Sequence, residues 1–269
     1  MHELLRQLAQ GATVLDLGCA SGSFDSHGQS FRVVRIDLER DAAAPLSNFA
    51  QADAAKLPFP SQSFEAVISN HSLEHFDDLG GCLEEIGRVV KSSGALYIAV
   101  PDASTVSDRL YRWLARGGGH VNPFRSAPEL ATRIERATGL KHLATRTLCT
   151  SLSCLNRRNR RTRAPRRLLL IGGGTEMSLL LLSYFFRLSD RFLHTRMSVY
   201  GWALYFGNVE APIDCRTWSN VCVYCGSGHP SDWLREGRHV KRRVLFSTYR
   251  CPTCETTNFF TDDKHYLTY

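Results

Sequence analysis

The sequence lacks the long apolar segments that cross membranes. Its 269 residues contain no apolar run near the ~20 residues that a spanning helix needs, and Met177–Phe186 falls well short of that length. The first ten residues include the acid Glu3 and predict a short amphipathic helix rather than a secretory signal peptide. We therefore expect a cytoplasmic protein, which could also be peripheral at a membrane surface.

Acidic residues are scarce in one segment. Residues 151–200 hold ten basic side chains and two acidic ones, so this segment accounts for the net charge of +7. It contains a run of arginines with no acid among them: Arg157, Arg158, Arg160, Arg161, Arg163, Arg166 and Arg167. Such a run repels itself, and we expect it to be a solvated, mobile loop until an anionic partner neutralises it. The apolar residues 168–171 and Met177–Phe186 follow, which favours an anionic membrane surface over RNA, although Met177–Phe186 could equally pack in the core.

A glycine-punctuated turn follows the first predicted strand. Residues 13–24 read TVLDLGCASGSF, in which Asp16 lies near the strand's end and Gly18 and Gly22 allow a ligand or the next helix to approach the backbone. The turn lacks the Gly-x-Gly-x-x-Gly spacing of nicotinamide dinucleotide sites. An adenosyl ligand without a pyrophosphate fits this turn better.

A carboxylate then appears where such a ligand needs one. Residues 31–36 predict a second strand, and Asp37 ends it 21 residues after Asp16, a position suited to both ribose hydroxyls. A third short apolar segment precedes residues 51–59, QADAAKLPF, and residues 63–71, SFEAVISNH, predict a fourth strand.

These motifs, taken in order, resemble the class I S-adenosylmethionine (SAM) dependent methyltransferases, closest to the type 11 group that includes the quinone-biosynthesis enzymes. The resemblance covers about residues 1–148 and rests on DLGCASG, Asp37, DA before LPF, FEAVISN, HSLEH, and LEEIGRVVK before GALYI. Where the family usually has Lys-Pro-Gly-Gly before strand five, this chain has KSSG at residues 91–94, which alters a turn away from the expected cofactor site.

The resemblance implies an α/β fold with a doubly wound, seven-stranded Rossmann-like sheet. We expect a methyltransferase domain at residues 1–210, with an insert at about residues 150–198 between strands six and seven. SAM is the implied cofactor. The residues carried over to its site are Asp16, Gly18, Cys19, Ala20, Gly22, Asp37, Leu38, Asp53, Ala54 and Asn70.

Two histidines are candidates for the acceptor side. Asn70 and His71 end the fourth strand and would face the sulfonium and the acceptor, and His71 or His120 could take a proton from a hydroxyl acceptor. Residues 71–75, HSLEH, also match the His-x-x-Glu-His pattern of zinc proteases, which we disfavour because His71 lies at a strand end. The Asn-Pro-Pro-Tyr motif of amino-nitrogen methylation and a Pro-Cys nucleophile for cytosine are both absent after this strand.

Four of the nine cysteines form two Cys-x-x-Cys pairs, at Cys222 and Cys225 and at Cys251 and Cys254. This pattern predicts a zinc-ribbon-like domain at residues 215–269, with a closed and therefore structural Zn²⁺ site; a rubredoxin-like iron site is the minority alternative. We expect the remaining five cysteines to behave as small apolar residues in a reducing compartment: Cys19, Cys82, Cys149, Cys154 and Cys215. Cys149 and Cys154 could pair if oxidised.

The function we expect is SAM-dependent methyl transfer to a small-molecule, lipid-linked or glycan acceptor. One alternative is an RNA methyltransferase that uses the arginine run and the zinc ribbon to bind its substrate. The other is a SAM-fold docking module without turnover.

Overall fold

The computed structural model describes residues 1–39, 47–114, 119–159 and 166–263. The chain divides into two compact units. The first comprises Met1–Asp102, Gly119–Arg146 and Trp202–Cys215. The second comprises Ala103–Gly118, Thr147–Gly201 and Arg216–Tyr269.

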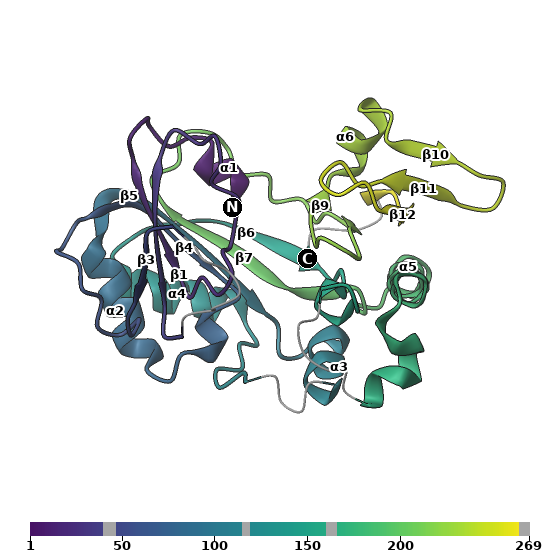
Figure 1. The fold of residues 1–269 in the computed structure, drawn as a ribbon, viewed down its shortest axis with the longest axis horizontal. Helices are drawn as coiled ribbons and strands as arrows, with labels where there is room; N and C mark the ends of the chain where they lie inside the picture. The colour runs from purple at the N-terminus through teal and green to yellow at the C-terminus, as the bar shows by residue number, and fades with distance from the viewer. Residues whose placement is uncertain (40–46, 115–118, 160–165, 264–269) are drawn as a thin grey trace. The chain divides into compact units, whose positions relative to one another are not determined.

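A seven-stranded sheet has the strand order β3-β2-β1-β4-β5-β7-β6 (Figure 1). Its strands are β1 Thr13–Leu17, β2 Arg32–Asp37, β3 Phe49–Gln51, β4 Phe64–Asn70, β5 Val90–Pro101, β6 His142–Cys149 and β7 Val199–Gly207. The registers show that β3, β2, β1, β4 and β5 are parallel to their neighbours. The predicted seven-stranded α/β sheet is therefore confirmed, with residues 150–198 inserted between its last two strands in sequence.

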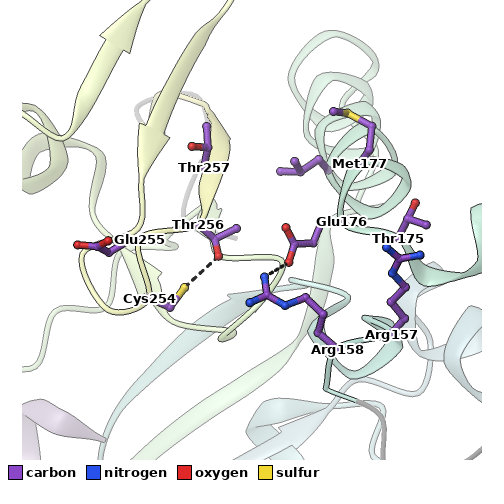
Figure 2. Close-up of a pocket in the computed structure, with 10 residues that line it drawn as sticks. Arg157, Arg158, Thr175, Glu176, Met177, Cys254, Glu255, Thr256 and Thr257 are labelled. Atoms are coloured by element: carbon purple, nitrogen blue, oxygen red, sulfur yellow. Dashed lines mark hydrogen bonds and ion pairs between the residues drawn. The ribbon is translucent and has the colours of Figure 1, made fainter.

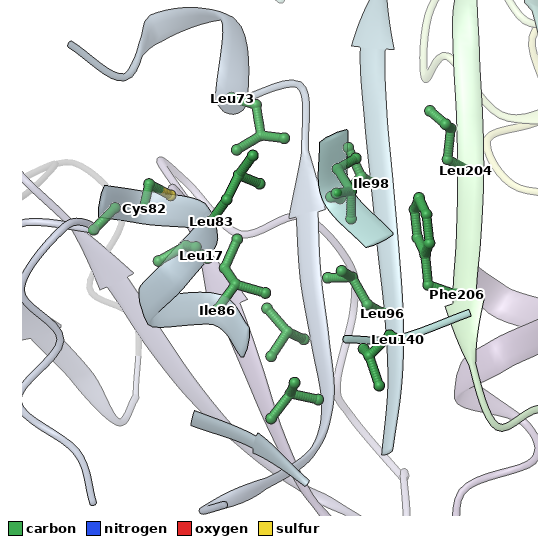
Figure 3. Packing of buried hydrophobic residues seen from close by; sticks show 14 of the residues in the cluster. Leu17, Leu73, Cys82, Leu83, Ile86, Leu96, Ile98, Leu140, Leu204 and Phe206 are labelled. Atoms are coloured by element: carbon green, nitrogen blue, oxygen red, sulfur yellow. The ribbon is translucent and has the colours of Figure 1, made fainter. Parts of the chain in front are cut away.

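Two helices pack on this sheet within the first unit: α2 Leu79–Val89 and α4 Ala127–Thr138. Ser126 caps α4 by accepting a hydrogen bond from the backbone N–H of Glu129, as the capping pattern Ser-x-x-Glu predicts. Their apolar faces and the strands enclose one large core that includes Leu17, Leu83 and Ile98 (Figure 3). The first unit thus has a large core, which fixes the strands and the loops that follow their carboxyl ends.

The second unit contains the insert. Its elements are α3 Val106–Leu114, η2 Ser153–Leu155, η3 Arg166–Gly174 and α5 Glu176–Leu193. Leu114, Leu168, Leu179 and Val223 meet in a small apolar cluster. The Met177–Phe186 segment lies inside α5, and it is only partly core, because Leu179 and Phe186 are buried while other apolar side chains are exposed.

The C-terminal residues of the second unit form a small β-rich module. It contains β8 Asn220–Val221 paired with β9 Gly228–His229, then α6 Ser231–Glu236 and the antiparallel sheet β10 Val240–Arg242, β11 Ser247–Arg250 and β12 Thr257–Phe260. Its core is limited to a few residues around Cys222 and Cys251. The remaining elements in the described part of the chain are the short α1 His2–Leu5 and η1 Leu73–His75. The predicted domain limits, 1–210 and 215–269, stay predictions.

Candidate functional site

The turn after β1 is joined to the end of β2 by backbone hydrogen bonds. The N–H groups of Gly18 and Cys19 donate to the carbonyl of Ile36, at 2.8 and 3.0 Å. Ala20 has a φ of 43° and donates its N–H to Asp37 Oδ2 at 2.7 Å, and the Gly22 N–H closes the turn on the Cys19 carbonyl. The structure therefore brings together the turn and the carboxylate that the sequence predicts to share one ligand.

Gly18 is required by packing against the loop after β4. A Cβ on Gly18 would lie 2.4 Å from Ser72 Cβ, and its φ of +66° is unfavourable for other residues. The Ser72 hydroxyl lies 2.6 Å from that of Ser69 and donates to the carbonyl of Leu17 at 3.0 Å. Neither serine was predicted as part of this site, because nothing in their spacing shows which strand lies beside β1.

Asp16 is fully buried beneath this turn. Its Oδ2 accepts a hydrogen bond from the N–H of Ser23 at 3.1 Å and lies 3.8 Å from Arg35 Nε. Burial raises the pKa of Asp16, although the Ser23 hydrogen bonds and Arg35 oppose this shift. Its Oδ1 has no hydrogen-bond partner among the residues that the structure describes. A donor from a ligand would satisfy this oxygen.

The end of β2 presents a carboxylate beside an apolar side chain. Asp37 Oδ1 accepts the N–H of Glu39 at 3.2 Å, and Leu38 is 66% exposed. Gln51 holds the Leu38 backbone by donating its side-chain amide to that carbonyl at 2.8 Å. An exposed leucine next to a half-buried carboxylate suits a nucleoside, which has both a flat apolar base and polar hydroxyls.

The other predicted cofactor residues follow β3 and end β4. Asp53 is exposed and accepts the N–H of Ala55 at 2.9 Å, Ala54 is buried, and Asn70 is the last residue of β4. Since β3, β2, β1 and β4 are adjacent and parallel, their carboxyl ends share one edge of the sheet. We call this the cofactor edge. The role of each residue there stays a prediction.

His71 leaves β4 in a strained backbone conformation. Its φ is 56°, and its backbone N–H donates to the carbonyl of Ala99 at 2.9 Å. Burial lowers the pKa of the His71 imidazole to about 4, and the neighbouring His120 and His75 add to this shift. Such an imidazole is neutral at pH 7 but a weak base. The short helix η1 begins only at Leu73, so His71 and His75 do not share a helix as the zinc-protease alternative requires.

His120 lies beside η1. Its ring centroid is 4.9 Å from that of His75, and one ligand atom each of Glu74, His75 and His120 lie within 4.8 Å of one another. Burial lowers the pKa of His75. We call these three residues the histidine cluster. The HSLEH motif was the sequence signal for Glu74 and His75, but it could not show that His120 is their neighbour.

The four predicted metal ligands converge in the second unit. Cys222 Sγ lies 3.6 Å from Cys254 Sγ, Cys225 Sγ lies 3.6 Å from Cys251 Sγ, and all four sulfurs lie within 4.8 Å of one another. We call them the four-cysteine centre. Sulfurs bound to one tetrahedral Zn²⁺ at ~2.3 Å are separated by about 3.8 Å, so this spacing fits a metal.

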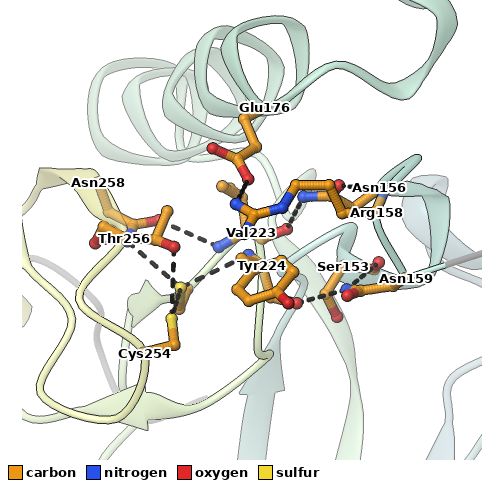
Figure 4. Close-up of polar contacts among 11 residues, drawn as sticks. Ser153, Asn156, Arg158, Asn159, Glu176, Val223, Tyr224, Cys254, Thr256 and Asn258 are labelled. Atoms are coloured by element: carbon orange, nitrogen blue, oxygen red, sulfur yellow. Dashed lines mark hydrogen bonds and ion pairs between the residues drawn. The ribbon is translucent and has the colours of Figure 1, made fainter.

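Hydrogen-bonding groups lie close to these sulfurs, and Figure 4 shows Thr256, Tyr224 and Asn258 near Cys254. Asn258 Nδ2 and the N–H of Tyr224 donate to Cys222 Sγ at 3.4 and 3.5 Å, and His229 Nε2 lies 3.5 Å from Cys251 Sγ. The thiols interact through their short contacts: hydrogen bonds with Cys222 and Cys251 lower the pKa of Cys225, whereas hydrogen bonds with Cys222 and Cys225 raise the pKa of Cys251. It is therefore the spacing of the four sulfurs that supports a metal.

None of the nine cysteines is in a disulfide, so the conditional pairing of Cys149 with Cys154 is not formed. Burial raises the pKa of both Cys19 and Cys149 to about 12. These thiols therefore stay protonated at neutral pH, as expected for small apolar residues.

The arginine run does have an acidic partner, contrary to our expectation. Arg158 forms an ion pair with Glu176 at 2.5 Å, and its guanidinium lies 4.2 Å from the ring centroid of Tyr224. Arg167 donates to the carbonyl of Trp113 and lies over its ring. Tertiary structure brings Glu176 to Arg158, which the sequence spacing could not reveal. Three arginines of the run, Arg160, Arg161 and Arg163, lie outside the described residues, as does the side chain of Arg166.

A cleft of about 660 Å³ lies beside the four-cysteine centre (Figure 2). It is lined by Arg157, Arg158, Thr175, Glu176, Met177, Leu180, Cys254, Glu255, Thr256 and Thr257. None of the predicted cofactor residues lines it. No helix within the described part of the chain is long and apolar enough to cross a membrane.

A family model described as a methyltransferase domain matches residues 1–145. The malonyl-[acyl-carrier protein] O-methyltransferase of Yersinia pestis is 29% identical over 147 residues, which cover 49% of this chain and 53% of that protein. The mitochondrial arginine-hydroxylase NDUFAF5 of Rattus norvegicus is 32% identical over 139 residues, which cover 46% of this chain and 40% of that protein. The match thus spans about half the length of these curated relatives.

A solved structure shares the fold. The SAM dependent methyltransferase from Archaeoglobus fulgidus aligns with a TM-score of 0.51 at 17% sequence identity, covering 75% of this chain and 88% of that one.

Proposed function

The chain belongs to the methyltransferase domain family through residues 1–145, and we propose that it transfers a methyl group from SAM to a small, lipid-linked or glycan acceptor. The observation that carries this proposal is the cofactor edge. There the turn after β1 is hydrogen-bonded to Asp37, and Asp16, Leu38 and Asn70 end or follow adjacent parallel strands.

The residues present fit SAM. The buried Asp16 Oδ1 lacks a hydrogen-bond partner among the described residues, and the methionine ammonium of SAM is a donor of opposite charge. Asp37 would hold the ribose hydroxyls and Leu38 would contact the adenosyl group. SAM supplies an electrophilic methyl group on a sulfonium, so the two carboxylates also suit its positive charge.

Within this proposal the chain's own residues bind and align the reactants. Alignment and exclusion of water supply much of the acceleration of a displacement reaction. His71, with a pKa of about 4, is a poor general base near neutrality, so a proton from a hydroxyl acceptor would go to His120 or to water.

Exposed apolar side chains in the second unit favour a lipid-linked acceptor and an anionic membrane surface. Along α5, four residues at helical spacing form an apolar stripe that is 54–68% exposed: Met177, Leu181, Phe185 and Phe192. At the β10–β11 turn, Val244 and Leu245 are 100% and 90% exposed and follow Lys241, Arg242 and Arg243. Apolar residues flanked by cations are typical of interfacial elements.

These two elements lie near each other in the second unit. The ring of Phe259 stacks on that of Tyr184 of α5, with 4.6 Å between the ring centroids. It also lies edge-on to the ring of Phe246 in the β10–β11 turn, with 5.2 Å between the centroids. RNA binding has less support, since Arg158 and Arg167 are already engaged by Glu176 and Trp113. We also propose that the four-cysteine centre holds a structural Zn²⁺, because four thiolates leave no open coordination position.

The acceptor is tested by incubating the protein with methyl-labelled SAM and separated extract fractions, followed by mass spectrometry. We expect the mass gain of one methyl group in a lipid or glycolipid fraction. Methylation confined to the RNA fraction would replace this acceptor class with the alternative. Binding of SAM without any methylated product would favour the docking-module hypothesis.

A further inference from the structure

The histidine cluster joins two segments that are distant in sequence. Glu74 and His75 belong to η1, directly after β4, whereas His120 follows β5 and α3 along the chain. One ligand atom from each residue lies within 4.8 Å of the other two. A single ion at the centre of such a triangle could contact all three after small side-chain rotations.

Hydrogen bonds hold the two segments against each other. The carbonyl of Glu74 accepts the N–H groups of Val121 and Asn122 at 2.8 and 3.0 Å. The Asn122 side-chain amide donates to the carbonyls of Leu73 and Phe76, at 3.0 and 2.7 Å. The two segments that carry the three side chains are thus fixed against each other, which lowers the cost of organising a binding site.

The hydrogen bond of His75 suits metal binding. Its Nδ1 lies 3.0 Å from the carbonyl oxygen of Gly119, which can only accept, so Nδ1 carries the proton. In the neutral imidazole Nε2 then has a free lone pair. Metal-binding histidines usually donate their other N–H to a carbonyl or a carboxylate in this way.

The donor set indicates the class of ion. Glu74 is 1% exposed, and a buried carboxylate is stabilised by a nearby cation. Two imidazoles and one carboxylate are a ligand set for Zn²⁺ and for other divalent first-row transition metals. Three protein ligands leave a coordination position for water or a substrate oxygen, unlike the closed four-cysteine centre.

We propose that Glu74, His75 and His120 bind one divalent transition-metal ion with an open coordination position. Two of its ligands follow the carboxyl end of β4, in η1, only a few residues after Asn70 and His71 in the sequence. An acceptor oxygen is the ligand class that would fill the open position. With the ion bound, His120 cannot also accept the acceptor's proton, which would then go to water. Metal binding itself does not depend on the proposed methyl transfer, and it is measured without SAM.

The test uses the full chain, stripped of metal and titrated with Zn²⁺ under reducing conditions. We expect two ions per chain, with X-ray absorption showing one ion bound by sulfur at ~2.3 Å and one by nitrogen and oxygen at ~2.0–2.1 Å. His120→Ala and Glu74→Gln should each weaken binding of the second ion by more than about tenfold and leave the affinity for the sulfur-bound ion unchanged. His27→Ala, at an exposed histidine, is the matched control.

One result would overturn the proposal: a single, purely sulfur-bound Zn²⁺ per chain, or two ions whose binding is the same in His120→Ala. Circular dichroism melting of each variant identifies loss of folding. Because His120 is partly exposed and Glu74 is buried, we expect His120→Ala to disturb folding less than Glu74→Gln. SAM binding measured on the same samples separates failure of the metal site from failure of the proposed function.

Discussion

At the cofactor edge of the first unit, backbone hydrogen bonds and a large apolar core hold the turn, Asp16 and Asp37 in place. At the four-cysteine centre of the second unit, the core among the described residues is small, and Cys222, Cys251 and Cys254 belong to it themselves. A site supported by a large core can be organised before its ligand arrives, whereas a small module depends on its metal for folding. The two regions should therefore respond differently to loss of their ligands.

The largest effect is expected from removing the metal of the four-cysteine centre. Cys222→Ser, or chelation, should unfold residues after about 215, because metal binding in such modules contributes ~10–16 kcal/mol to folding. SAM binding should persist. Elemental analysis and amide hydrogen exchange measure this, with Cys215→Ser at an exposed cysteine as the control. Wild-type protein that contains iron or no metal would contradict the Zn²⁺ assignment.

A smaller effect should follow from crowding the turn of the cofactor edge. Gly18→Ala places a Cβ against Ser72 and should lower the free energy of unfolding by about 2–4 kcal/mol. Gly28→Ala is the matched control, because Gly28 has a φ of +71° but no atom within 4 Å of the added Cβ. Denaturant titration compares the two. Equal losses would mean that backbone strain, and not the contact with Ser72, makes glycine necessary.

The smallest effect on stability is expected at the apolar stripe of α5. Leu181→Ser combined with Phe185→Ser should change the melting temperature little, since both side chains are more than half exposed. Binding to phosphatidylglycerol vesicles should fall strongly. Leu143→Ser, at an exposed leucine of β6, serves as the control. Unchanged cosedimentation of the double variant with vesicles would rule out this stripe as the membrane contact.

Local patterns in the sequence predicted the strands, the cap of α4 and the pairing of the two Cys-x-x-Cys motifs, because each depends on residues close together in the chain. Contacts between distant residues could not be predicted in the same way. The apposition of Gly18 and Ser72 depends on β1 lying beside β4, and the ion pair of Arg158 with Glu176 depends on how the insert folds. The left-handed conformation of His71, which separates it from η1, is likewise set by the tertiary structure.

The central claim is that the cofactor edge binds SAM through Asp37, and calorimetric titration of SAM tests it directly. The wild-type protein and Glu39→Ala should bind with similar affinity. Asp37→Ala should bind about 10- to 100-fold more weakly, since charge-assisted hydrogen bonds contribute ~1.5–3 kcal/mol. Circular dichroism confirms that the variant is folded. An unchanged affinity for SAM in folded Asp37→Ala would contradict the assignment of this edge as the cofactor site.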